Sequence, residues 1–163
     1  MSITNMRSGG TMEPQFNPMQ LEESISANYT KHAPLGGSFE RMHFTHTSNL
    51  ALSLIFVFDD YAVGGSGPND ELGVLERARR FLFAFCLPAR QPVDIIGGGT
   101  ADAHLVWPGY YSVIAKVLNV KSRSTMFWAN GKPRIWTAEV SLEWSPSDRV
   151  FADDMTNYGT IFQ

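Results

Sequence analysis

The sequence has only one cysteine, Cys86, and this excludes an intramolecular disulfide framework and any zinc site built from several cysteines. It also lacks long apolar runs. No stretch approaches the roughly eighteen apolar residues of a membrane-spanning helix, and the first twenty residues lack the apolar segment of a signal peptide. We therefore expect a soluble chain made in the cytoplasm, with no membrane partner.

Positive charge is not in excess either. Thirteen Lys and Arg residues stand against sixteen Asp and Glu residues, a formal net charge of −3 at pH 7. A protein that neutralises duplex phosphates needs clustered basic residues, so tight nucleic-acid binding is disfavoured. With 163 residues, 44% hydrophobic and 18% charged, the composition predicts one globular domain with a sizeable core.

Motifs for catalysis and cofactor binding are missing as well. The glycine run 97–100 lacks the lysine of a phosphate-binding loop, and no Gly-x-Ser-x-Gly elbow is present. Cys86, at the end of an expected helix, is interpreted as a packed thiol. His43 and His46 are three residues apart in an expected strand, so we predict that they point to opposite faces and share no metal. We expect no catalytic residue, no cofactor, no metal and no enzymatic activity.

Alternation of apolar and polar residues is the strongest pattern in the chain. In 50–58 every even position is apolar, which predicts one buried face, while the other face carries small or β-branched residues that could be half exposed or could meet another chain. In 135–144 the even positions carry Trp, Ala, Val, Leu and Trp, and the odd positions from 137 to 143 are polar. The strands predicted in this way are 21–29, 41–47, 50–58, 103–107, 110–120, 122–128 and 135–144.

One amphipathic helix is expected, capped by Asn69 or Asp70 and ended by Pro88. Its apolar residues recur at spacings of three and four. The turn at Asn130–Gly131 is a hairpin signal, because a tight reversal requires positive φ. Residues 1–19 show no period and predict an extended N-terminal arm, 20–144 form the predicted β domain, and 145–163 form a C-terminal tail.

Three segments of the predicted β domain resemble the tail-tube protein family of contractile phages and related injection systems. The first is Leu-Val-Trp-Pro-Gly at 105–109 followed by a strand, and the second is the hairpin 124–138 around Asn130–Gly131. The third is 39–60, which is similar to the family's long hairpin strand ending in acidic residues. The family often has Asp where this chain has Asn130, and Ala after the arginine where this chain has Ile135. Residues 145–163 are too short for the peptidoglycan-binding LysM module of many relatives, so we expect no cell-wall binding.

This resemblance implies a mainly β fold, an antiparallel β-sandwich or split β-barrel with one flanking α-helix. It further implies a homo-hexameric ring, stacked on other rings, whose lumen passes DNA without specific binding. The partners would be further copies of the chain and other phage tail or baseplate proteins, and the location would be the virion tail, assembled in the host cytoplasm. Whether the ring belongs to the tail tube or to the baseplate region that initiates the tube stays open.

The contacts between subunits or between rings are predicted at the loop 59–70 and at the Asn130 turn, and the N-terminal arm is expected to contribute to stacking. The candidate contact residues are Asp59, Asp60, Tyr61, Asn69, Asp70, Asn130, Gly131, Lys132 and Arg134. Two alternatives remain. One is a monomeric module that binds a small ligand or a carbohydrate through Trp107 or Trp128, and the other is a hydrolase with an unrecognised site.

Overall fold

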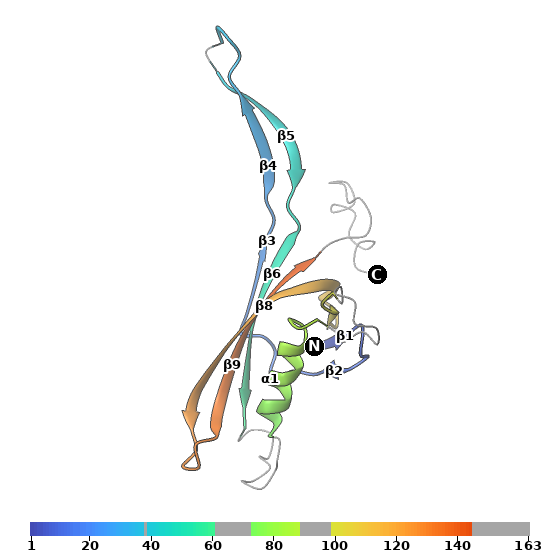
Figure 1. The fold of residues 1–163 in the computed structure, drawn as a ribbon, viewed down its shortest axis with the longest axis vertical. Helices are drawn as coiled ribbons and strands as arrows, with labels where there is room; N and C mark the ends of the chain where they lie inside the picture. Colours follow the sequence, from blue (N-terminus) through green and yellow to red (C-terminus); the bar gives the residue numbers. More distant parts are fainter. Residues whose placement is uncertain (38, 61–72, 89–98, 145–163) are drawn as a thin grey trace.

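The computed structural model describes residues 1–37, 39–60, 73–88 and 99–144 (Figure 1). In this part of the chain, strands are the main element. They form a seven-stranded antiparallel sheet in the order β2-β1-β7-β8-β9-β6-β3 and a two-stranded ribbon, β4-β5. The strands are β1 (Ser2–Asn5), β2 (Thr11–Met12), β3 (Gln20–Ser24), β4 (Ala27–His32), β5 (Arg41–Thr47), β6 (Leu50–Asp59), β7 (Asp102–Trp107), β8 (Tyr111–Phe127) and β9 (Pro133–Trp144).

The core lies between the inner face of the sheet and the helix α1 (Val74–Ala84). The alternation predicted for β6 and β9 is confirmed, since the even-numbered residues 52–58 and 136–142 are buried. On the other face of β6, Ala51 is exposed and the remaining residues are partly exposed, which agrees with the expectation of a half-exposed face. Helix α1 buries Leu75, Ala78 and Leu82 against this core, and Phe85 after its end is fully buried.

Strand β8 joins two parts of the sheet. Its first residues pair with β7 and its later residues, up to Phe127, pair with β9, with a bulge between Val117 and Asn119. The two strands predicted at 110–120 and 122–128 are therefore one strand of 17 residues. Burial raises the pKa of Tyr111, and a hydrogen bond to Glu23 of β3 raises it further. Because β9 and β6 lie between β8 and β3, this contact shows that the sheet curls, without closing into a barrel in the described residues. The predicted fold class, mainly β and antiparallel with one helix, is confirmed.

Residues 1–19, predicted as an extended arm without a period, contain two strands that the sequence did not reveal. Ser2–Asn5 forms β1, which pairs with β7, and Thr11–Met12 pairs with β1 as an edge strand. Ile3 and Asn5 are buried, and the Asn5 side-chain oxygen accepts hydrogen bonds from the backbone of Arg7 and Ser8. The segment was missed because its pairing partner lies about a hundred residues away in the chain.

Two further expectations around the helix change. The residue at the N-cap is Gly73, without a side-chain cap, and the predicted caps Asn69 and Asp70 lie outside the described residues. Cys86 is exposed and is not a packed thiol, because the helix ends at Ala84 and the chain turns away from the core after the buried Phe85. In the described part of the chain, no helix is long and apolar enough to cross a membrane.

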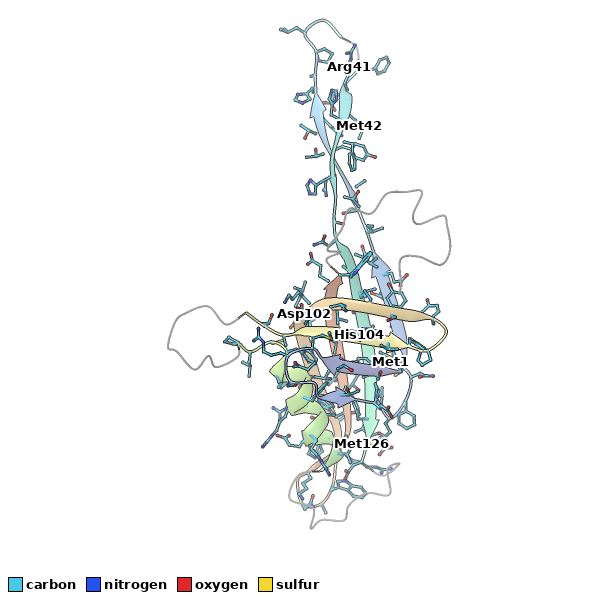
Figure 2. The ribbon with its side chains drawn as sticks, turned by 90° about the vertical axis from the view of Figure 1, so that its right-hand side faces the viewer. Met1, Arg41, Met42, Asp102, His104 and Met126 are labelled. Carbon is cyan, nitrogen blue, oxygen red and sulfur yellow. The ribbon has the colours of Figure 1, made fainter. Side chains whose placement is uncertain are left out.

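The ribbon β4-β5 projects from the body as a long arm (Figures 1 and 2). The expected strand 21–29 is divided here, because β3 belongs to the main sheet and β4 to the arm. The prediction that His43 and His46 lie on opposite faces is wrong. His46 pairs with Asn28 and Phe44 with Tyr29, so Thr45 is an extra residue in a bulge, and it returns His46 to the face of His43.

Candidate functional site

The predicted contact residues that the structure describes gather at one end of the sheet, opposite the arm (Figure 1). This end is formed by the C-terminal end of β6 and by the turn between β8 and β9, because Asp59 pairs with Ile135 and Phe127 pairs with Pro133. We call this group, with Trp128, the turn cluster; it consists of Asp59, Asp60, Trp128, Asn130, Gly131, Lys132 and Arg134. Tyr61, Asn69 and Asp70 lie outside the described residues.

Backbone hydrogen bonds shape the turn between β8 and β9. The amide of Trp128 donates to the carbonyl of Lys132 at 2.9 Å, and the amide of Gly131 donates to the carbonyl of Trp128 at 2.9 Å. The side-chain oxygen of Asn130 accepts a hydrogen bond from the amide of Lys132 at 3.0 Å. Gly131 has φ of 80°, which favours glycine. The hairpin is confirmed, and its loop is longer than two residues.

Trp128 links the turn to the end of β6. Its Nε1 donates to Oδ2 of Asp60 at 3.3 Å, and the guanidinium of Arg134 lies over its ring, 5.3 Å from the centroid. The amide of Asp60 donates to the carbonyl of Arg134 at 3.0 Å. The turn cluster thus brings acidic, basic and aromatic side chains together at a partly exposed end of the sheet, and two of these residue types, Trp and Arg, are enriched at protein interfaces.

Gln15 was not predicted to take part, yet it joins the N-terminal segment to this end of the sheet. Its Nε2 donates to the carbonyl of Asp59 at 2.9 Å, and its Oε1 accepts from the amide of Asp59 at 2.8 Å. No sequence motif identifies a glutamine whose side chain makes the two backbone hydrogen bonds that a neighbouring strand would otherwise make. The exposure of the arm β4-β5 was not predicted either, since alternation in its sequence does not reveal that both faces are exposed.

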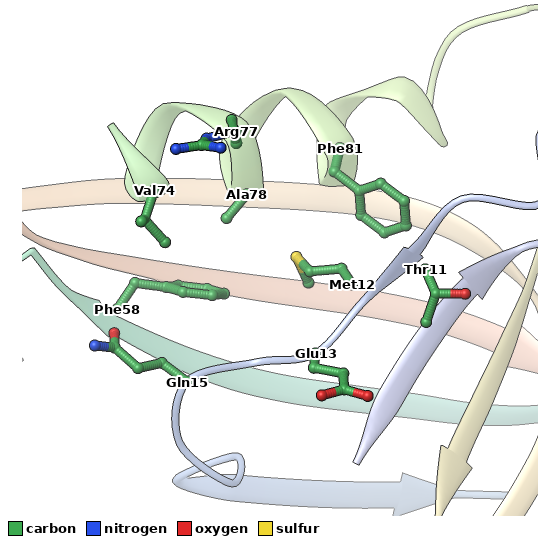
Figure 3. Close-up of a pocket in the computed structure, with 9 residues that line it drawn as sticks. All are labelled: Thr11, Met12, Glu13, Gln15, Phe58, Val74, Arg77, Ala78 and Phe81. Atoms are coloured by element: carbon green, nitrogen blue, oxygen red, sulfur yellow. The ribbon is translucent and has the colours of Figure 1, made fainter. Parts of the chain in front are cut away.

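A groove opens beside the turn cluster, between α1 and the N-terminal segment (Figure 3). Its volume is about 500 Å³. The charged groups Glu13 and Arg77 lie among mostly apolar side chains. The residues that line it are Thr11, Met12, Glu13, Gln15, Phe58, Val74, Arg77, Ala78 and Phe81.

Arginines on the exposed side of α1 are largely engaged with the helix itself. Glu76 accepts hydrogen bonds from Arg80 at 2.9 Å and from Arg79 at 3.3 Å. The bond from Arg80 is the main reason that the pKa of Glu76 is lowered. Exposed pairs of this kind are typical of a solvated helix face.

Open strand edges are the other feature of the surface. Strand β7 reaches β8 only from Tyr111 to Lys116, so residues 118–127 of β8 have β9 as a neighbour on one side and no strand on the other among the described residues. Within the same described ranges, strand β3 pairs only with β6. Unpaired edges are templates for pairing with another chain.

Taken together, the fold and these surfaces define a protein built for assembly with other chains. Among the described residues, no three His, Cys, Asp or Glu side chains are grouped so that they could hold a metal ion. The family of contractile injection system tube proteins matches residues 2–148, nearly all of the chain. The chain belongs to this family, and it is a structural component of an injection tube. No curated protein matches the chain.

Proposed function

We propose that copies of the chain assemble into a hexameric ring, either of the tail tube or of the baseplate region that initiates the tube, and that the ring is a conduit for DNA ejection. The observation that carries this proposal is the four-stranded block β8-β9-β6-β3, with an open edge on each side. The role is structural and not enzymatic.

Strand direction favours ring closure. Each neighbouring pair in the block is antiparallel, so β8 and β3 at its two edges run in opposite directions. A rotation about an axis roughly parallel to the strands places β3 of one copy beside β8 of the next, again antiparallel. The sheet then continues from copy to copy, and ring closure removes every open edge of the block.

The charges on the two edges are complementary. Glu22 of β3 is exposed, whereas the open part of β8 carries Lys121 and Arg123, also exposed. Lys121 already pairs with Glu139 of its own copy at 3.2 Å, which leaves Arg123 as the better partner for an acid of a neighbouring copy. Opposite charges at such an edge fix which strands pair.

The outer face of the block suits the wall of a channel. Along β9 the residues of this face are Thr137, Glu139, Ser141 and Glu143, all partly exposed. Strand β9 thus adds polar and acidic side chains and no basic one to this face, and a wall without a basic excess lets DNA slide because it offers few positive charges to hold phosphates. The turn cluster lies at one end of the block, where it would contact the next ring or another tail or baseplate protein of the particle.

The first test is the mass of the purified protein in solution by light scattering, with negative-stain images of the same sample. We expect rings of about six copies, alone or stacked. Arg123→Glu and Glu22→Lys should each weaken the ring, and the double variant should restore it, because the pair is again opposite in charge. A stable monomer at high concentration, unchanged by addition of candidate tail partners, contradicts the proposal and favours a monomeric ligand-binding module.

A further inference from the structure

The arm β4-β5 has no partner within its own copy among the described residues. Every residue of both strands is exposed, and its only strand contacts run between β4 and β5. Figure 2 shows the side chains of the arm projecting from a narrow ribbon, well away from the body. An isolated two-stranded ribbon is marginally stable in water, and an arm of this kind gains stability when another surface covers it.

The two faces of the arm differ in chemistry. The cross-strand register places Tyr29 opposite Phe44 and Lys31 opposite Met42 on one face. The rings of Tyr29 and Phe44 meet edge to face, with centroids 5.8 Å apart. The other face carries polar side chains. Two hydrogen bonds cross it, one between Thr30 and Thr45 and one between Asn28 and His46. The arm is therefore a ribbon with one apolar and one polar face.

The tip of the arm extends this apolar character. Leu35 and Phe39 are exposed to 107% and 86%, the most exposed of the large apolar side chains in the described residues. Two such side chains at the end of a projecting hairpin have no role in the core of their own copy. Exposed apolar groups that cluster at one place mark an interaction site.

The groove beside the turn cluster has the matching properties. Met12, Phe58, Val74, Ala78 and Phe81 make it apolar, and Figure 3 shows these side chains converging between the helix and the N-terminal segment. Its volume of about 500 Å³ lies within the range of sites that enclose several apolar groups. The groove also carries one acid and one base, Glu13 and Arg77, so its match to the tip of the arm lies in its apolar side chains.

The arm cannot reach the groove of its own copy. Phe58 lies near the far end of β6, and β5 leads almost directly into β6 with two residues between them. At about 3.3 Å per residue, the extended path from Arg41 to Phe58 is roughly 55 Å. The tip and the groove are thus at opposite ends of the same long hairpin strand.

We propose that the tip of the arm, Leu35 and Phe39, docks into the groove of a second copy of the chain, in the next ring along the tube. Complementary surfaces at opposite ends of one molecule give a head-to-tail contact, which repeats without closing and produces a filament. This inference rests on the proposed ring and names the contact that stacks one ring on the next.

Disulfide trapping tests the contact directly. In a Cys86→Ser background, one batch carries Phe39→Cys and a second batch carries Val74→Cys, and the two are mixed and oxidised. We expect a cross-linked dimer that joins one copy of each kind. The matched control pairs Phe39→Cys with Ser141→Cys on the outer face of β9. Absence of the 39–74 cross-link, or an equal yield in the control, overturns the docking.

A second measurement separates stacking from ring formation. Leu35→Ser with Phe39→Ser should leave single rings in negative-stain images but reduce their stacking affinity by about a hundredfold, since two apolar side chains lose their burial. Thr30→Ser, on the polar face of the arm, is the control and should stack as the parent does. Unchanged stacking of the double variant overturns the inference while the ring proposal stands. Loss of rings in the parent protein refutes the ring proposal, and the cross-link then still decides the arm contact.

Discussion

Trp136 offers a quantitative test of the core. It is 2% exposed and packs against Phe58, with ring centroids 5.1 Å apart. Its indole Nε1 is buried and has no hydrogen-bond partner in the part of the chain that the structure describes. A buried donor without a partner has lost its hydrogen bond to water, at a cost of about 1–3 kcal/mol.

Replacement by phenylalanine changes two terms of opposite sign. Trp136→Phe removes part of the buried ring system, which costs about 1–2 kcal/mol. It also removes the unpaired donor, which returns about 1–3 kcal/mol. The free energy of unfolding should therefore stay within about 1 kcal/mol of the parent value, whereas Trp136→Ala should lose about 3–5 kcal/mol.

Urea denaturation of the three proteins measures these differences, provided that the slopes of the transitions agree. The alanine variant shows that the site is buried in solution. If Trp136→Phe is as destabilising as Trp136→Ala, the indole N–H has a partner that stabilises it, and the reasoning from an unpaired donor is wrong.

Two further changes probe the turn cluster and the curled sheet. Gly131→Ala places an L side chain at φ of 80° and should lower the free energy of unfolding by about 1–2 kcal/mol in urea denaturation. The control is Gly99→Ala, where the added Cβ meets open space and φ is not positive, and its free energy of unfolding should change by less than about 0.5 kcal/mol. Equal effects of the two substitutions would contradict the argument from backbone strain. The pKa of Tyr111 is raised on folding. The stability that its neutral phenol contributes is therefore complete below the pKa of the unfolded chain, about 10, and is lost as the pH rises through the pKa of the folded protein. The stability advantage of the parent over Tyr111→Phe should accordingly shrink above about pH 10, with Tyr110→Phe as the control for loss of a neighbouring hydroxyl, and an advantage that is constant with pH would refute the assignment.

Local alternation was sufficient to predict the faces of the central strands. Leu54 and Val140 lie on the faces expected from their positions, because β6 and β9 are covered by a helix on one side only. The bulge at Thr45 could not be predicted, since one extra residue reverses every following side chain without any marker in the sequence. Strand β1 depends on pairing with β7, so Ser2–Asn5 shows no period of its own strong enough to be recognised.

In the turn cluster, too, the local turn could be predicted from the sequence, whereas contacts between residues far apart in the chain could not. Asn130 and Gly131 could be placed in a turn because turn chemistry is local. Their proximity to Asp60 follows from the register of β6 on β9, which was not known from the sequence, although both segments had been chosen as candidates. The two hydrogen bonds between the Gln15 side chain and the Asp59 backbone depend entirely on the folded path of the N-terminal segment.

The direct continuation of the arm into β6 has a mechanical consequence. Only Ser48 and Asn49 separate β5 from β6, and all ten residues of β6 pair with β9. In the proposed tube, whose axis runs roughly parallel to the strands, a pull on the tip of the arm would act along β6 and would load its hydrogen bonds to β9 together and not one after another. Strands loaded in shear in this way resist separation better than strands that are peeled apart, so in the proposed tube the arm would pass axial tension to the whole length of the β6–β9 pairing.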